Sequence, residues 1–117
     1  MSNWLREFET FAPHLTVVKY HSALQERREL QHTIRHLADT ASLDIVLAPI
    51  TYFSKEASDD RAFLRKIQFD YLIVDEGHLL KNARGMRYKS MDRFQTLHRL
   101  LLTVRVQCVC VLSGCDH

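Results

Sequence analysis

Residues 69–82 read FDYLIVDEGHLLKN, and the expectation for the whole fold starts from them. The apolar run FDYLIV predicts a buried strand, and two carboxylates, Asp75 and Glu76, follow it directly. Carboxylates resist burial unless they are paired or coordinated, so we expect this strand to end at a ligand. The alternative interpretation is an ordinary polar turn after a strand.

The rest of the chain alternates between strand and helix patterns. Expected strands cover residues 15–20, 44–53, 69–74 and 99–103, and expected helices cover residues 2–11, 22–41, 58–67 and 86–97. Ser22, with Gln25 three residues later, predicts a capping box for the second helix. This alternation predicts an α/β fold with a parallel sheet, in which ligands bind at the carboxyl ends of the strands.

Composition sets broad limits. The 117 residues, 46% of them hydrophobic, fit one domain, and the net charge of +2 neither indicates nor excludes binding to nucleic acid. No apolar run is long enough for a membrane span, and residues 1–11 do not resemble a secretory signal, so we expect an intracellular protein. The three cysteines lie within the last ten residues, which favours reduced thiols over disulfides.

The acidic turn has a known chemical use. In P-loop nucleotide hydrolases, an acidic residue after such a strand holds Mg²⁺, which bridges the phosphates. A second carboxylate beside it can orient or deprotonate the attacking water. Gly77 would allow a sharp turn, and His78 could link the site to a neighbouring segment by hydrogen bonding.

The string LIVDEGHLLKN resembles motif II of the superfamily-two helicase-like ATPases. It is most similar to the SWI/SNF-type chromatin remodellers of the Etl-like branch, in which KN follows the DEGH box shortly, as Lys81 and Asn82 do here. Four other segments match in the family's order. NWLREFETFAP resembles the stretch after motif Ia, and YHSALQER another family stretch, with His21 replacing a glycine. IVLAPITYF resembles motif Ib, and HRLLLT the lead into motif III.

The resemblance implies that residues 1–103 are a partial RecA-like helicase ATP-binding lobe. It implies a nuclear protein that uses ATP and Mg²⁺, and duplex DNA, nucleosomes and histones as partners. Asp75 would contact Mg²⁺ through water, Glu76 would activate the attacking water, and His78 would couple the site to motif III. The other implied site residues are Gly77 and Thr103 for nucleotide coupling, and Thr51 and Tyr52 for DNA binding.

Two features depart from the family pattern. No glycine is followed by lysine, so the phosphate loop G-x-x-x-x-G-K-[ST] is absent. We therefore expect a lobe without the phosphate-loop strand, a motif II strand without a neighbour, low stability and no ATP hydrolysis by this chain alone. After Thr103, residues 104–117 replace the expected motif III. We expect this tail to be foreign to the fold, through a retained intron or gene-model artefact, and Met1 to be an internal methionine.

Three other clusters of residues have side chains that could bind a metal ion or a phosphate. The set Cys108, Cys110, Cys115 and His117 has C-x-C spacing unsuited to structural zinc, so we expect none, and the alternating tail predicts an exposed edge strand. His32 and His36 have helical metal-chelating spacing, but a solvated helix face is favoured. The basic set Arg84, Arg87, Lys89 and Arg93 suits either a phosphate backbone or solvent.

Three functions therefore remain open from the sequence. The first is a part of the first ATPase lobe of a chromatin remodeller. The second is a non-catalytic truncated isoform that binds DNA or a protein partner. The third is an unrelated Mg²⁺-dependent hydrolase that uses Asp75 and Glu76.

Overall fold

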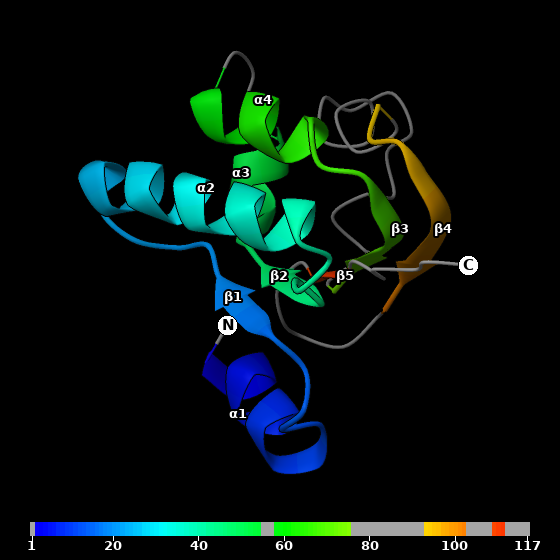
Figure 1. The fold of residues 1–117 in the computed structure, drawn as a ribbon. Coiled ribbons are helices and arrows are strands. Elements are labelled where there is room, and N and C mark those ends of the chain that lie inside the picture. The colour runs from blue at the N-terminus through cyan, green and yellow to red at the C-terminus, as the bar shows by residue number, and fades with distance from the viewer. Residues whose placement is uncertain (1, 55–57, 76–92, 103–108, 112–117) are drawn as a thin grey trace.

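The computed structural model describes residues 2–54, 58–75, 93–102 and 109–111. The helices are α1 (Ser2–Phe11), α2 (Leu24–Asp39), α3 (Ile50–Ser54) and α4 (Asp59–Arg65). The strands are β1 (Val17–Lys19), β2 (Ile45–Leu47), β3 (Phe69–Val74), β4 (Thr96–Leu101) and β5 (Val109–Val111). Helices α2, α3 and α4 gather on one side of the sheet, and α1 lies on the other (Figure 1).

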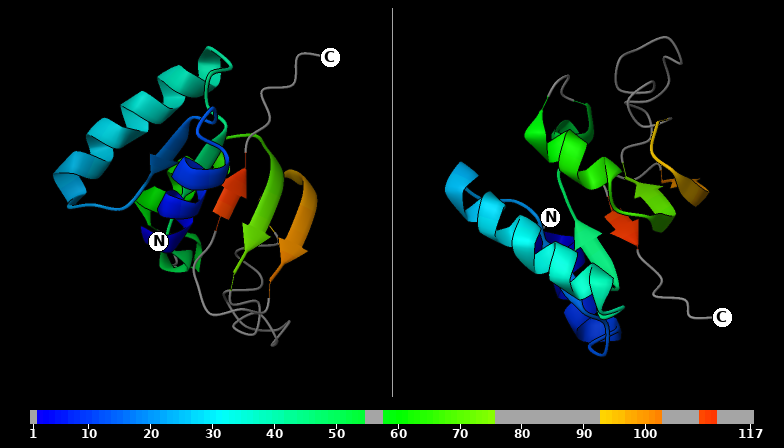
Figure 2. Two further views of the ribbon diagram at one scale, coloured as in Figure 1. Left: turned by 90° about the horizontal axis from the view of Figure 1, so that it is seen from below. Right: turned by 45° about the horizontal axis from the view of Figure 1, so that its top comes forward.

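The strands form one five-stranded sheet in the order β1-β2-β5-β3-β4. Strands β1 and β2 pair in parallel, as do β3 and β4, whereas β5 runs antiparallel to both of its neighbours (Figure 2). The expected α/β class and parallel strand pairs are confirmed, but the expectation of a wholly parallel sheet is wrong. Because β1 to β4 share one direction, their carboxyl ends meet at one edge of the sheet.

Strand β5 corrects two further expectations about the tail. It lies inside the sheet between β2 and β3, so this part of the tail is not an exposed edge strand. It also gives β3 a second neighbour, with Leu72 paired to Cys110, so the expected gap beside the motif II strand is wrong. The physical reason is that the Val-Cys-Val segment has strong β propensity and its backbone satisfies both open strand edges.

The two faces of the sheet carry separate apolar clusters. Val46, Leu72 and Val74 belong to the core beneath α2 and α4, whereas Ile45 and Leu47 pack with the α1 side. This split follows the two-residue period of a strand, which sends successive side chains to opposite faces. The apolar face of α1 covers the second cluster with Trp4, Leu5 and Phe8. Both faces of β2 are thus covered, which fits its continuous apolar run, because such runs are typical of strands that are buried on both sides.

Helix α2 begins later than the capping pattern predicts. Ala23 occupies the N-cap position and makes no side-chain capping hydrogen bond, so the predicted cap at Ser22 is wrong. The side chain of Arg27 instead donates from Nη1 to the carbonyl oxygen of Ser22 at 3.0 Å, which holds that residue outside the helix. The sequence also predicts an apolar stripe along this helix, made of Leu30, Ile34, Leu37, Ala38 and Ala41. Within the helix this stripe is confirmed, because Ile34 is buried and Leu30, Leu37 and Ala38 pack against the core.

The predicted strand over residues 44–53 is wrong in its second half. Strand β2 ends at Leu47, and helix α3 begins at Ile50. Pro49 explains why the strand ends, because it has no N–H to donate to a central ladder of the sheet. Its carbonyl oxygen accepts a hydrogen bond from the Tyr52 backbone N–H at 3.0 Å.

The segments around the acidic turn follow the prediction more closely. The hydroxyl of Ser58 caps α4 by accepting from the Arg61 N–H at 3.1 Å, and β3 covers Phe69–Val74 as expected. The end of the helix predicted over 86–97 is wrong. Thr96 and Leu97 belong to strand β4, which begins at Thr96, opposite Phe69 of β3. Residues 86–92 of that prediction lie outside the described part of the chain.

Candidate functional site

Asp75 lies at the carboxyl end of β3 with only 4% of its surface exposed. It follows Ile73 by two residues, and alternate residues of a strand face the same side of the sheet. Because Ile73 packs on the α1 side, the Asp75 side chain lies on that side too. There, Nε1 of Trp4 donates a hydrogen bond to Oδ2 of Asp75 at 3.0 Å. The buried carboxylate that the sequence predicts is therefore present, and the first turn of α1 contacts it.

The chemistry of this position suits a magnesium ion. A carboxylate oxygen is a ligand that Mg²⁺ prefers, and Mg²⁺ commonly uses one or two carboxylates together with waters and substrate phosphates. The indole of Trp4 is a neutral donor, so it orients the carboxylate without cancelling its charge. Within the described ranges, no three His, Cys, Asp or Glu side chains gather as a protein-only metal cage. Asp75 therefore fits a site in which phosphates supply the other ligands.

Four of the predicted site residues cannot be placed beside Asp75. Glu76, Gly77, His78 and Thr103 lie outside the described residues. The carboxyl end of β4 is nonetheless fixed, because the Leu102 N–H donates to the Val74 carbonyl oxygen at 2.8 Å. The chain positions on either side of this contact are those that the sequence assigns to motifs II and III.

The predicted DNA-binding pair lies in the first turn of α3. Thr51 is exposed, whereas Tyr52 is half-buried, and its ring packs edge-on against Tyr20 with the ring centres 5.6 Å apart. The Tyr52 hydroxyl accepts a hydrogen bond from Nη1 of Arg27 at 2.8 Å. The structure thus leaves Thr51 facing solvent and engages Tyr52 inside the protein.

A polar cluster that sequence reasoning missed supports α3. Its centre is Asp60, whose Oδ1 accepts from the Tyr20 hydroxyl at 2.6 Å and lies 3.2 Å from Nε of Arg27. That Nε is buried and its N–H is not aligned for a hydrogen bond, so the contact is an ion pair only. Gln31 donates to the Tyr20 hydroxyl at 2.9 Å. Burial, and then the bond to Asp60, raise the pKa of Tyr20 above its ordinary range.

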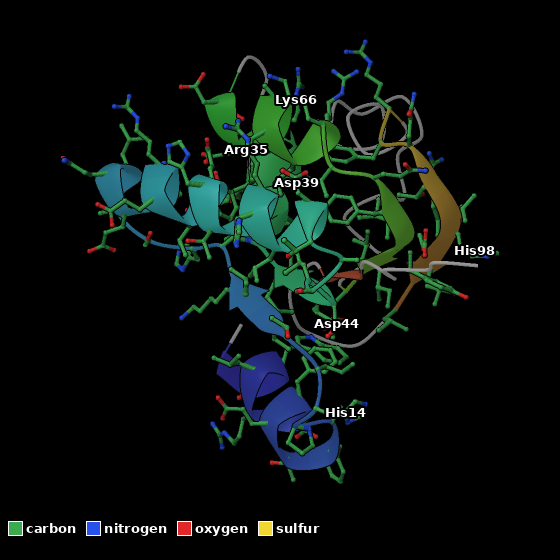
Figure 3. The ribbon with its side chains drawn as sticks, viewed as in Figure 1. His14, Arg35, Asp39, Asp44, Lys66 and His98 are labelled. Atoms are coloured by element: carbon green, nitrogen blue, oxygen red, sulfur yellow. The ribbon has the colours of Figure 1, made fainter. Side chains whose placement is uncertain are left out.

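Two surface pockets lie away from Asp75. One, with a volume of about 230 Å³, lies between α2 and α4, and its lining includes the exposed basic side chains of Arg28, Arg35 and Lys66 together with Asp59 and Asp60. Arg35 and Lys66 are labelled in Figure 3. The other, of about 370 Å³, lies at the opposite edge of the sheet, at the starts of β3 and β4, and includes Arg93. Neither pocket contains a predicted catalytic residue.

Two minor predictions can also be placed. His32 and His36 are both exposed on α2, as expected for a solvated helix face. Cys108, Cys115 and His117 of the set judged unsuited to zinc lie outside the described residues, as do Arg84, Arg87 and Lys89 of the basic stretch. In the part of the chain that the structure describes, no helix has the length and apolarity to span a membrane.

Comparison with known proteins identifies relatives of this chain. Residues 1–104 match the family model of the SNF2-related domain. The chain is 42% identical over 104 residues to the ATP-dependent helicase fft1 of Schizosaccharomyces pombe. The aligned region covers 88% of this chain and 10% of fft1.

Two other relatives give the same result. The ATP-dependent helicase FUN30 of Saccharomyces cerevisiae is 36% identical over 88% of this chain and 9% of its own length. A mouse SWI/SNF-related matrix-associated actin-dependent regulator of chromatin, subfamily A containing DEAD/H box 1, is 34% identical over 88% of this chain and 10% of its own. The chain spans about a tenth of the length of these curated relatives. The resemblance to SWI/SNF-type proteins is thereby confirmed, and the chain belongs to the SNF2-related family.

Proposed function

We propose that this chain is part of the first ATP-binding lobe of a nuclear, ATP-dependent chromatin remodeller. The observation that carries the proposal is the buried carboxylate of Asp75 at the carboxyl end of β3, in a chain that matches the SNF2-related domain over residues 1–104. Open α/β sheets bind their ligands at this edge. The described strands are compatible with a partial RecA-like lobe, in which further strands would come from the rest of a longer protein.

The proposed chemistry assigns one task to each residue of the acidic turn. Asp75 would hold Mg²⁺ through water, and the ion would neutralise charge on the ATP phosphates. Glu76 would orient the attacking water and accept its proton. His78, with Gly77 and Thr103, would couple the nucleotide site to the neighbouring motif III segment. The fixed contact between Val74 and Leu102 supports that link, because it ties the ends of β3 and β4 together.

The proposed DNA contact is the exposed Thr51 at the start of α3. A hydroxyl and backbone N–H groups in this position can bind a phosphate, which positions a protein on DNA without reading its sequence. Tyr52 would serve this contact indirectly, since its hydroxyl is bound to Arg27. Duplex DNA and nucleosomes are the proposed partners.

A non-catalytic DNA-binding module is the second candidate. The observation that favours it is the group of exposed basic side chains, Arg28, Arg35 and Lys66, around the pocket between α2 and α4. Such a module would bind DNA in proportion to the phosphates it neutralises, with an affinity that falls steeply as salt rises. It would do so with or without Asp75 and Glu76.

A chimera tests the proposed function. Residues 1–104 of this chain would replace the matching segment of fft1, and DNA-stimulated ATP hydrolysis would be measured with the parent as reference. We expect the chimera to hydrolyse ATP, and Glu76→Gln to lower its turnover about 100-fold or more because the water loses its base. The matched control is Glu29→Gln, which removes the same charge from an exposed position on α2.

Three outcomes separate the candidates. Activity that depends on Asp75 and Glu76 supports the ATPase assignment. A folded chimera that binds DNA but hydrolyses no ATP contradicts it and favours the non-catalytic module. Hydrolysis that survives Asp75→Asn and Glu76→Gln together contradicts the roles assigned to the acidic turn.

A further inference from the structure

Trp4 is held in place by packing that does not involve Asp75. It lies in the first turn of α1 and belongs to the cluster around Ile45 and Leu47. Its ring stacks on Phe8 with the ring centres 6.0 Å apart and the planes inclined by 30°. The position of the indole N–H is therefore fixed by the seating of α1 on the sheet.

The main chain at Asp75 is held independently as well. Strand β3 is paired at both of its edges, and the Val74 carbonyl oxygen accepts from the Leu102 N–H at 2.8 Å. With the backbone fixed, the remaining freedom of Asp75 is rotation of its side chain. The hydrogen bond from Trp4 Nε1 to Oδ2 restrains that rotation across a separation of 71 residues in the sequence.

The choice of donor has a chemical consequence. A lysine or arginine in the place of Trp4 would also orient the carboxylate, but its positive charge would compete with a metal ion. An indole N–H is a donor only and carries no charge. It can therefore contribute to the orientation of the carboxylate without adding a positive charge of its own.

We propose that Trp4 is a positioning residue for Asp75, and that it sets the direction in which the carboxylate meets Mg²⁺. The inference rests on the proposed function for the metal, but the positioning itself is a property of these two side chains. Hydrogen-bonding partners of metal ligands commonly change metal affinity 10- to 100-fold when they are removed. The position of α1 on the sheet thereby becomes a determinant of the nucleotide site.

The first experiment measures metal binding by the 117-residue chain, with Mn²⁺ as the probe and electron paramagnetic resonance as the readout. Trp4→Phe keeps an aromatic ring against Phe8 and removes the N–H. We expect its dissociation constant for Mn²⁺ to rise about 10-fold. The matched control is Phe8→Leu, which disturbs the same packing but leaves the donor, and it should keep the affinity of the wild-type chain. Equal affinities for the Trp4→Phe variant and the wild type would overturn the proposal.

A second experiment needs no metal. The three-bond couplings between the α- and β-protons of Asp75 report its side-chain rotamer. We expect the couplings of Asp75 to differ between the wild-type chain and Trp4→Phe, because the donor that directs Oδ2 is lost. The chain has a single tryptophan, so one indole N–H resonance reports on Trp4, and Asp75→Asn should shift it upfield. Unchanged Asp75 couplings in the Trp4→Phe variant would refute the positioning role.

The two experiments fail in distinguishable ways. If Mn²⁺ binding by the wild-type chain is present but unchanged by Asp75→Asn, the proposed metal role of Asp75 fails. If that binding is absent because the site needs phosphates as further ligands, the couplings alone decide the role of Trp4. If Trp4→Phe does not fold, benzothienylalanine can replace the single tryptophan. It has the shape of the indole, with sulfur in place of the N–H, and the same predictions apply to it.

Discussion

Nη1 of Arg27 lies 2.8 Å from the Tyr52 hydroxyl, and the carbon of the same guanidinium lies 4.9 Å from the centre of the Tyr52 ring. One side chain of α2 therefore holds both the polar and the aromatic part of a residue on α3. A second nitrogen of Arg27 pairs with Asp60 on α4. Arg27 thus links α2 to α3 through Tyr52 and to α4 through Asp60.

Removal of the Tyr52 hydroxyl should cost stability while the ring stays in place. We expect Tyr52→Phe to lower the free energy of unfolding by about 1 kcal/mol, because Arg27 loses one acceptor but keeps its contact with the ring. Urea denaturation of the purified chain measures this. Tyr71→Phe is the matched control, since Tyr71 is exposed and contacts His98 through its ring, and its effect should stay below about 0.5 kcal/mol. Equal effects for the two variants would contradict the role of the hydroxyl.

Asp60 should matter more than its acidic neighbour. The side chains of Arg27 and Asp60 are only 19% and 13% exposed, so neutralising the carboxylate leaves a largely buried guanidinium without its counter-charge. We expect Asp60→Asn to cost about 2 kcal/mol, somewhat less than for a fully buried pair. Asp59→Asn removes the same charge from an exposed position in the same helix turn and should cost about 0.5 kcal/mol. An Asp60→Asn chain as stable as Asp59→Asn would show that the cluster contributes little.

Local patterns predicted the parts of this fold that depend on local chemistry. The run from Phe69 to Val74 is apolar, is followed by a carboxylate, and forms β3 with the expected bounds. Ser58 before two acidic residues predicted the start of α4 correctly. In both segments, side-chain preferences and tertiary packing favour the same conformation.

The missed features depend on residues far apart in the sequence. Asp60 and Tyr20 are separated by 40 residues, and no spacing rule joins them. The hydrogen bond between Trp4 and Asp75 spans 71 residues, and no sequence pattern joins the two. The insertion of β5 between β2 and β3 depends on the open edges of strands formed much earlier in the chain. Such features require the three-dimensional arrangement.

The end of α2 contains a strained residue whose replacement should stabilise the protein. Ala41 was expected on the apolar stripe but lies beyond the C-cap Thr40, exposed, with a φ of 53°. The Ala41 N–H donates to the Ala38 carbonyl and the Ser42 N–H to that of Leu37, which is the Schellman arrangement usually completed by glycine. We expect Ala41→Gly to stabilise the chain by about 1 kcal/mol.

The same substitution inside the helix should act in the opposite direction. Ala38→Gly changes a residue with helical backbone in α2, so we expect it to destabilise by about 1 kcal/mol. Thermal unfolding followed by circular dichroism compares the two variants. A loss of stability in both would contradict the strain assigned to Ala41.

Stability should fall at alkaline pH through Tyr20. The side chain is fully buried, and burial together with the Asp60 bond raises the pKa of its hydroxyl above the ordinary value of about 10. The unfolded chain therefore loses this proton first as the pH rises. The stabilising contribution is complete below the unfolded pKa and is lost between that value and the folded one, at about 1.4 kcal/mol per pH unit.

The measurement compares urea unfolding of the wild type and Tyr20→Phe at several pH values from about 8 to about 11. Because phenylalanine does not titrate, the difference in unfolding free energy between the two proteins isolates Tyr20 from the other groups that titrate at alkaline pH. We expect this difference to be constant near pH 8 and to shift against the wild type above pH 10. Tyr71→Phe is the control, since its exposed hydroxyl should give no such trend. A difference that stays constant across the range would mean that Tyr20 ionises equally easily in the folded and unfolded chains.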